Sequence, residues 1–350
     1  MFEQGVIRPP SEASSLLLRV TRNCPWNQCV FCPAYKGTKF SRRTIEEVKR
    51  DIDAMAAQYK GVVRISSAFL QDADSLILPV DDVVAILEYL RKKFPKINRI
   101  TTYARAKTLK RKSVDDLRRL KEAGLTRVHA GMESGSAAVL ELIRKGLTPE
   151  EIVTGGRHVM DAGLELSEYI MPGIGGRALS QEHAVETARV LNEIRPHFIR
   201  VRTFAMHPLS PMQKMVREGA FAPMADDEIV GEIRLLLTLL DEMHSYFSCN
   251  DFSLNLLMQV DGFLDEKKAA MLAELDAFLA LSKREKQIYM LVQRSGYFRR
   301  PQDVVNDPEV LRQVLPEIEK LENAGEDGFN RYIDVLKSHQ LPQPQTDEWR

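Results

Sequence analysis

The chain has 350 residues, of which 44% are hydrophobic and 28% charged, a composition typical of a globular protein with a sizeable core. Its 49 basic and 49 acidic residues cancel, so no global field draws it toward nucleic acid or an anionic membrane. Residues 1–15 lack the apolar core of a signal peptide, and no run of about 18 apolar residues occurs. We therefore expect a cytoplasmic protein without a membrane span, and nothing in the composition indicates nucleic-acid binding.

Short β-rich runs alternate with longer amphipathic stretches over the first two thirds of the chain. The expected strands are residues 15–21, 62–70, 99–104, 127–132, 164–171 and 198–204. The first expected helix follows Thr44, with apolar residues at helical spacing up to residue 55. The further expected helices are residues 81–94, 113–124, 137–145, 149–162, 181–194 and 226–246.

Six strand-then-helix units without hairpin turns predict an all-parallel sheet with right-handed crossovers. We expect an α/β fold in which this sheet curves into a partial (β/α)6 barrel, with ligands at the carboxyl ends of the strands. Residues 1–14 precede the barrel and residues 15–248 form it. Residues 249–350 are expected to be a helical C-terminal extension, with amphipathic helices near residues 271–279 and 285–293.

Three of the four cysteines, Cys24, Cys29 and Cys32, form a C-x4-C-x2-C loop directly after the first expected strand. In a reducing compartment such a cluster indicates metal or redox chemistry rather than disulfides. Three thiolates can hold three irons of a 4Fe–4S cube and leave the fourth iron open to a small molecule. Zinc is the competing metal, but it prefers four ligands, and Cys249 is far away in the sequence. The remaining alternative is three unrelated buried cysteines.

The cysteine loop, with the aromatic Phe31 just before its last cysteine, resembles that of radical S-adenosylmethionine (SAM) enzymes. The resemblance implies that Cys24, Cys29 and Cys32 ligate a 4Fe–4S cluster and that SAM binds the open iron. The loop has one residue more between Cys24 and Cys29 than the common C-x3-C-x2-C spacing. It therefore indicates the superfamily without assigning a subgroup.

Two further segments at strand ends extend the resemblance. Asp72, Ala73 and Asp74 resemble the Gly-Gly-Glu-like segment that receives the SAM amino group, which needs hydrogen-bond acceptors. Glu133 and Ser134 are similar to the G-x-E-S-G segment of the Elp3, MiaB and NifB-like branch, which lies near the SAM ribose and methionine. The alternatives are a polar turn at residues 72–74 and a helix cap at Ser134.

Charged residues on the last two expected strands are further candidates for SAM binding. Glu168 lies inside an apolar run, where a carboxylate is costly unless it is paired or faces a polar cavity. Arg200 and Arg202 share one face of their strand, and Arg202 is a candidate partner for the SAM carboxylate or for Glu168. Both arginines facing solvent is the alternative. Arg105 has the same two interpretations: it binds a carboxylate of SAM or of the substrate, or it is a solvated charge. The basic run at residues 105–112 is typical of a solvated face.

The resemblance implies a one-electron cleavage of SAM to methionine and a 5′-deoxyadenosyl radical, which takes a hydrogen atom from an unidentified substrate. A reductant of the flavodoxin or ferredoxin type would then be a partner. A non-catalytic iron–sulfur protein that carries electrons or senses oxygen is the alternative, although such proteins usually supply four cysteines. A zinc-stabilised binding module is a third possibility. Among enzymes, RNA modification resembling methylthiotransferases and a haem-pathway role resembling coproporphyrinogen oxidase both stay open.

Overall fold

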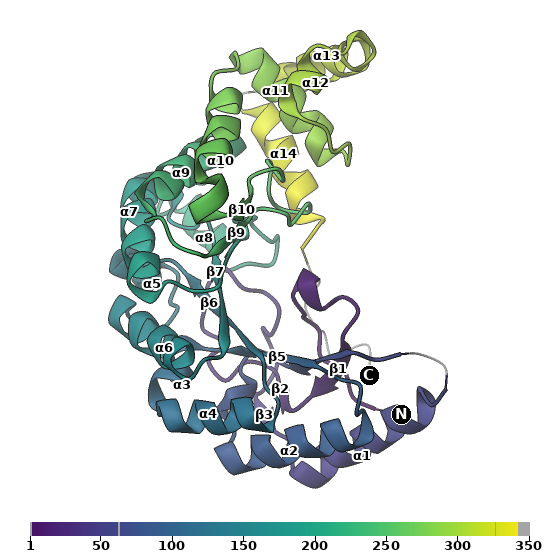
Figure 1. The fold of residues 1–350 in the computed structure, drawn as a ribbon. Coiled ribbons are helices and arrows are strands. Elements are labelled where there is room, and N and C mark those ends of the chain that lie inside the picture. The colour runs from purple at the N-terminus through teal and green to yellow at the C-terminus, as the bar shows by residue number, and fades with distance from the viewer. Residues whose placement is uncertain (1, 62–63, 326, 342–350) are drawn as a thin grey trace. The chain divides into compact units, whose positions relative to one another are not determined.

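The computed structural model describes residues 2–61, 64–325 and 327–341 (Figure 1). These residues divide into two compact units. Unit 1 comprises residues 2–132 and 144–169, and unit 2 comprises residues 133–143 and 170–341. The domain boundaries expected at residues 14 and 248 stay predictions.

The fold is α/β, with a mostly parallel sheet of eight strands in the order β1-β4-β5-β6-β7-β8-β9-β10. Neighbouring strands β1, β4, β5 and β6 pair in parallel, as do β8 and β9. The strands are β1 (Leu16–Arg19), β4 (Ser67–Gln71), β5 (Arg99–Ala104), β6 (Arg127–Glu133), β7 (Glu165–Ile170), β8 (Phe198–Val201), β9 (Tyr246–Ser248) and β10 (Asp261–Phe263). A mostly parallel sheet flanked by helices confirms the expected fold class and is consistent with a partial barrel.

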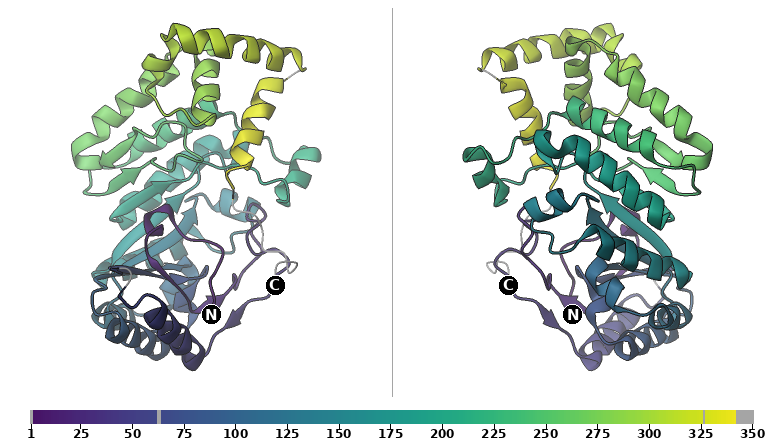
Figure 2. Two further views of the ribbon diagram at one scale, coloured as in Figure 1. Left: turned by 90° about the vertical axis from the view of Figure 1, so that its right-hand side faces the viewer. Right: turned by 90° about the vertical axis from the view of Figure 1, so that its left-hand side faces the viewer.

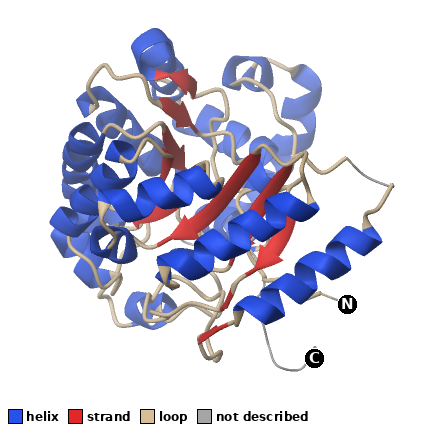
Figure 3. Ribbon diagram, turned by 60° about the horizontal axis from the view of Figure 1, so that its bottom comes forward, coloured by secondary structure: helices blue, strands red, loops and turns tan. Residues whose placement is uncertain are grey.

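Capped helices cover the strands of unit 1, as Figure 3 shows for the helices in front of the red strands. Thr44, Ser113 and Thr148 each begin a helix in a capping box, because each is followed three residues later by an acidic residue. Helix α2 packs against both α1 and α4, and α3 packs against α6. The bounds are α1 (Ile45–Gln58), α2 (Val80–Lys93), α3 (Ala106–Arg111), α4 (Val114–Ala123) and α6 (Pro149–Asp161).

The helices of unit 2 pack on one another in a series that continues to the green and yellow helices of Figure 2. Helix α9 contacts α7 and α10, and α11, α13 and α14 contact one another. The bounds are α5 (Ala137–Leu142), α7 (Gly176–Ile194), α8 (Met212–Arg217), α9 (Asp226–Leu239), α10 (Leu264–Leu279), α11 (Lys283–Arg294), α12 (Pro301–Val305), α13 (Pro308–Asn323) and α14 (Gly328–Ser338). Short 3₁₀ turns lie at Pro10–Glu12 and Ser75–Ile77.

The structure corrects several of the expected elements. The sheet is not all-parallel, because β10 pairs antiparallel to β9 and a separate antiparallel pair joins β2 (Thr21–Arg22) to β3 (Ser41–Arg42). The helix expected over residues 226–246 ends at Leu239, and Tyr246 begins β9, where its N–H bonds the carbonyl of His197. The expected strand at residues 62–70 begins only at Ser67, and residues 62 and 63 lie outside the described part.

Among the described residues, no helix combines the length and the apolar character that crossing a membrane requires.

Candidate functional site

The cysteine loop of unit 1 leaves strand β2 and carries its three thiols in a half-buried position. The pKa of the Cys32 thiol is raised to about 11, chiefly by burial and also by the charges of Cys29 and Cys24, while a backbone hydrogen bond from Ala34 and the charge of Lys145 oppose the rise. The Cys24 and Cys29 sulfurs therefore lie within electrostatic reach of the Cys32 sulfur. The Lys145 ammonium also sits 5.9 Å from the centre of the Phe31 ring.

The chemistry of this donor set fits an iron–sulfur cluster. Three thiolates held near one another repel, and irons bound to them would offset that repulsion. Each thiolate of a cube binds a different iron, so the sulfurs need not converge on one point. Across the described residues, no group of three or more His, Cys, Asp or Glu side chains is arranged to hold a single metal ion.

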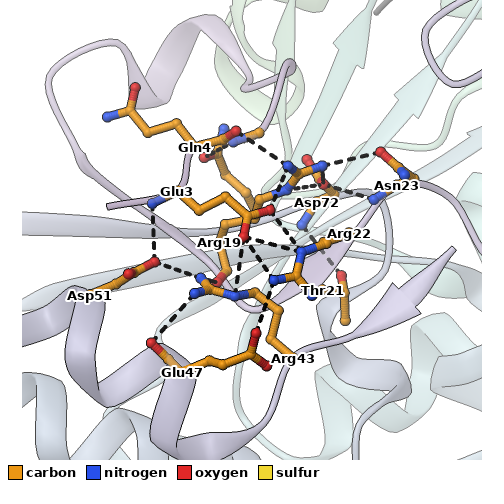
Figure 4. A network of polar contacts seen from close by, with 12 residues as sticks. Glu3, Gln4, Arg19, Thr21, Arg22, Asn23, Arg43, Glu47, Asp51 and Asp72 are labelled. Atoms are coloured by element: carbon orange, nitrogen blue, oxygen red, sulfur yellow. Dashed lines mark hydrogen bonds and ion pairs between the residues drawn. The ribbon is translucent and has the colours of Figure 1, made fainter. Parts of the chain in front are cut away.

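A buried carboxylate from the end of β4 fixes the start of the cysteine loop (Figure 4). Asp72 Oδ2 accepts hydrogen bonds from Arg19 Nε at 2.8 Å and from the backbone N–H of Asn23 at 2.9 Å. Its other oxygen accepts the Tyr35 hydroxyl at 3.3 Å. Burial raises the pKa of Asp72, although the charge of Arg19 opposes the rise. Because Asn23 directly precedes Cys24, Asp72 positions the loop.

The arginine that pairs with Asp72 belongs to a larger charge network, which Figure 4 shows. Glu3 contacts Arg19 at 2.8 Å, Arg22 at 2.9 Å and Arg43 at 3.5 Å. Arg43 also pairs with Asp51 at 2.6 Å. Burial alone would raise the pKa of Glu3, but hydrogen bonding to Arg22 and the three cationic charges bring it below its usual value. The N-terminal segment is thereby tied to β1, β2 and α1.

The middle of the cysteine loop is held by Trp26. Its indole Nε1 donates to the carbonyl of Arg144 at 2.8 Å, and the Arg105 guanidinium lies 5.2 Å from the ring centre. Gly146 gives the ring its space, since a Cβ there would come within 2.2 Å of the indole. Arg105 is therefore not a simple solvated charge, because it packs on the cysteine loop.

Ala73 and Asp74, the other two residues of the segment 72–74, differ in burial. Asp74 is buried, and it accepts the Thr108 hydroxyl at 2.6 Å and the Arg105 N–H at 3.3 Å. Burial raises the pKa of Asp74 to about 6 against these hydrogen bonds. Ala73 is half-buried. Both carboxylates of the segment thus have partners from the chain itself, and the backbone around Ala73 is its more open part.

In unit 2, the residues that follow β6 make a tight turn. Glu133 is half-buried and has a positive φ of 61°. Ser134 is fully buried; its hydroxyl accepts the N–H of Ser136 at 3.0 Å and hydrogen-bonds His183 Nδ1 at 2.8 Å. The helix cap is Ser136, whose hydroxyl accepts the N–H of Val139 at 3.1 Å. Ser134 is therefore not the cap of α5, which the sequence left open.

The charged candidates of the later strands lie in different units. Glu168, in β7 of unit 1, is 1% exposed. In unit 2, Arg202 is half-buried just beyond the end of β8, where its N–H bonds the carbonyl of Ile170 at 2.9 Å. The Arg200 guanidinium lies 5.3 Å from the centre of the Phe198 ring.

Sequence reasoning missed Arg19, Trp26 and His183 as parts of the site. A charge inside the apolar run at residues 16–20 was an available signal for Arg19.

Cys249 is buried, and burial raises the pKa of its thiol well above the usual value. It has the properties of a small core residue.

Comparison with known proteins gives the family. The family model of the radical SAM superfamily matches residues 18–191. A tRNA uridine(34) acetyltransferase of Methanocaldococcus infernus is 22% identical over 119 residues, 34% of this chain and 22% of that protein. An uncharacterized methyltransferase of Pyrococcus horikoshii is 29% identical over 159 residues, 44% of this chain and 32% of that protein. The chain thus spans about a third or less of the curated relatives that it matches.

Among solved structures, coproporphyrinogen III oxidase (HemN) from Escherichia coli, a radical SAM enzyme, is similar with a TM-score of 0.51 and 17% identity. The similarity covers 64% of this chain and 52% of that one, and it supports the fold. Membership of the matched family implies a 4Fe–4S cluster and SAM as cofactors. Residues 18–191 of this chain form a domain of the radical SAM superfamily of enzymes.

Proposed function

We propose that Cys24, Cys29 and Cys32 ligate a 4Fe–4S cluster and that the chain uses it to cleave SAM. The observation that carries the proposal is the group of three half-buried thiols in the loop after β2, of which Cys24 and Cys29 lie within electrostatic reach of Cys32. The reduced cluster would supply the electron that converts SAM to methionine and a 5′-deoxyadenosyl radical, which takes a hydrogen atom from a substrate.

The residues around the loop have two roles in this proposal. Asp72 and Tyr35 hold the loop through the contacts described above, and Trp26 anchors its longer first segment. Lys145 favours the thiolate of Cys32, since its charge lowers the pKa of that thiol. These side chains act before any substrate binds, because they fix where the sulfurs lie.

The contacts to SAM form a second part of the proposal. In unit 1, Phe31, Glu168 and the backbone at residues 72–74 are proposed to contact it, the backbone because the carboxylates of Asp72 and Asp74 already have partners. In unit 2, Glu133, Ser134 and Arg202 are proposed. Carboxylate and guanidinium groups suit the ribose hydroxyls and the carboxylate of SAM.

The partners follow from the chemistry. Single-electron cleavage requires a one-electron donor, and we propose one of the flavodoxin or ferredoxin type. The substrate is unassigned, and residues 249–341 are proposed to contribute to its recognition.

The Cys29→Ala variant tests the function, and Cys249→Ala is its matched control. Reconstituted without oxygen, wild type and Cys249→Ala should retain iron and sulfide and convert SAM to 5′-deoxyadenosine on reduction. The Cys29→Ala variant should lose the cluster and the product, because two thiolates remain for the cube. Iron and sulfide analysis, electron paramagnetic resonance and chromatography of the nucleoside measure these outcomes. Equal product from wild type and Cys29→Ala would refute the proposal.

A further inference from the structure

A buried polar cluster in unit 2 joins a proposed SAM contact, Ser134, to two side chains that the function proposed above does not use. It consists of Ser134, His183 and Glu232, whose exposed fractions are 0%, 0% and 4%. Ser134 Oγ lies 2.8 Å from His183 Nδ1, and His183 Nε2 lies 3.6 Å from Glu232 Oε1. Glu232 Oε1 also accepts the N–H of Gly173 at 2.7 Å, and its other oxygen accepts the Ser180 hydroxyl.

This cluster joins two loops to two helices. Ser134 lies in the loop after β6, and Gly173 lies in the loop after β7 at a positive φ of 86°. Ser180 and His183 belong to α7, and Glu232 belongs to α9. Both strand-end loops are therefore held by hydrogen bonds from helices behind them.

The loop after β6 is also pressed closely against α7. The N–H of Gly135 donates to the Thr187 hydroxyl at 2.9 Å, and a Cβ at Gly135 would come within 2.2 Å of the Glu186 carbonyl. The backbone of this loop consequently has little freedom to move toward α7, and its position depends on what α7 presents to it.

The hydrogen-bond pattern accommodates a neutral His183 that accepts at Nδ1. The Ser134 hydroxyl accepts the N–H of Ser136, so its own hydrogen is available for His183 Nδ1. In that arrangement His183 is a neutral imidazole with its proton on Nε2, which makes no hydrogen bond with a described residue and lies 3.6 Å from Glu232 Oε1. Burial lowers the pKa of His183 to about 4, which is consistent with a neutral ring.

The charge of Glu232 is poorly compensated. Burial raises the pKa of Glu232 to about 7 against the hydrogen bonds of Ser180 and Gly173. The groups that face it are Ser180 and His183 from α7 and Gly173 from the β7 loop, and no Lys or Arg side chain of the described residues pairs with it. A carboxyl in such a place costs stability when it ionises, because burial removes its hydration and no cation replaces it.

We propose that His183 and Glu232 are positioning residues that hold the loops after β6 and β7 in the form that receives SAM. The inference rests on the proposed function, since Glu133 and Ser134 of the first loop are proposed to contact SAM. The ionised carboxylate accepts the Gly173 N–H and attracts the His183 Nε2–H more strongly than the neutral acid. SAM should therefore bind more tightly above pH 7 than below it.

The test compares Glu232→Leu, Glu232→Gln and wild type, each as reconstituted holoprotein under anaerobic conditions. The dissociation constant of SAM is measured by equilibrium dialysis from pH 6 to pH 8.5, together with the iron content. Glu232→Leu should weaken SAM binding about tenfold or more with unchanged iron, because its side chain offers no acceptor to Gly173. Glu232→Gln keeps an acceptor without a charge, so its SAM binding should lose the pH dependence of wild type.

Asp226→Asn is the control for general destabilisation, because Asp226 lies on the same helix and is bonded elsewhere, to Arg294 and Lys337. It should lower stability and leave the dissociation constant of SAM within about twofold. Equal SAM affinity in Glu232→Leu and wild type would overturn the inference, as would a pH dependence of SAM binding in Glu232→Gln that equals that of wild type. A wild-type holoprotein that binds no SAM would reject the proposed function as well.

Discussion

At the scale of single residues, the strand β1 carries an arginine at a buried position, where a charged side chain needs an anionic partner. The Arg19 side chain is 4% exposed, and it lies 2.7 Å from Asp72 and 3.1 Å from the Asn23 side chain. A buried ion pair contributes little net stability, but removing one partner is costly because the other charge is left alone. Its position beside Cys24 suggests that the pair serves the geometry of the loop.

Replacing Asp72 by Asn tests this role. Arg19 would lose its buried anion and the Asn23 N–H its charged acceptor, so the free energy of unfolding should fall by about 3 kcal/mol. Retained iron after reconstitution should fall as well. Asp51→Asn is the control, since Asp51 pairs with Arg43 in the same network without touching the loop. Denaturant unfolding and iron analysis separate the two effects, and equal iron retention in both variants would contradict the role.

The cysteine loop was predictable because its pattern is local in the sequence. The residue pairs that hold the loops of the site in place were not predictable. Three cysteines within one loop are visible in the sequence at once. Arg19 meets Asp72 across a sequence separation of 53 residues, and Ser134 meets His183 across 49. Such pairs are created by the parallel crossovers of the fold, so a pattern search along the chain does not bring them together.

At the scale of elements, periodicity and turn residues predicted the long elements and missed the short ones. The helix expected over residues 113–124 is α4, which begins directly after the capping box at Ser113. Strands β9 and β10 were missed because each has only three residues, and they exist through their pairing with neighbours. The residues after Val201 leave β8 because the Thr203 N–H and hydroxyl bond Asn255 instead.

Gly146, in the connection between α5 and α6, makes room for Trp26 and so allows a test of how Trp26 holds the cysteine loop. Gly146 has a φ of 71°, and its replacement by Ala would push the Trp26 indole away from Arg105. We expect weaker iron retention and a shift of tryptophan emission to longer wavelength. Gly219→Ala is a close control, because Gly219 has the same φ of 71° and open space around it. Both variants carry the strain of a positive φ, so a shared loss of iron would mean that Trp26 is not the cause.

At the scale of the whole chain, long-range ion pairs organise the C-terminal helices of unit 2. Asp226 of α9 pairs with Arg294 of α11 and with Lys337 of α14, each at 2.8 Å, and all three side chains are buried. These two ion pairs connect α9 to α11 and to α14, and Lys337 lies 111 residues after Asp226 in the sequence. The amphipathic patterns predicted α10 and α11, but this junction depends on which helices meet, and the sequence does not show that.

The Asp226 junction should make unfolding dependent on pH in the acid range. Burial would raise the pKa of Asp226, but Arg294 and Lys337 lower it to about 2, below its ordinary 3.8. A lowered carboxyl pKa gives stability that is complete above about pH 4 and is lost as the pH falls toward 2. The size of this contribution is about 2 kcal/mol.

Acid titration of the Asp226→Asn variant tests that assignment. At neutral pH the variant should unfold more easily by about 3 kcal/mol, because Arg294 and Lys337 stay buried without their anion. Between pH 4 and pH 2 the gap to wild type should narrow, since protonation removes the same charge from wild type. Asp276→Asn removes an exposed partner of Arg234 and should change neither stability nor its pH dependence measurably. A gap between wild type and Asp226→Asn that stays constant down to pH 2 would mean that the charge of Asp226 is not what holds α9, α11 and α14 together.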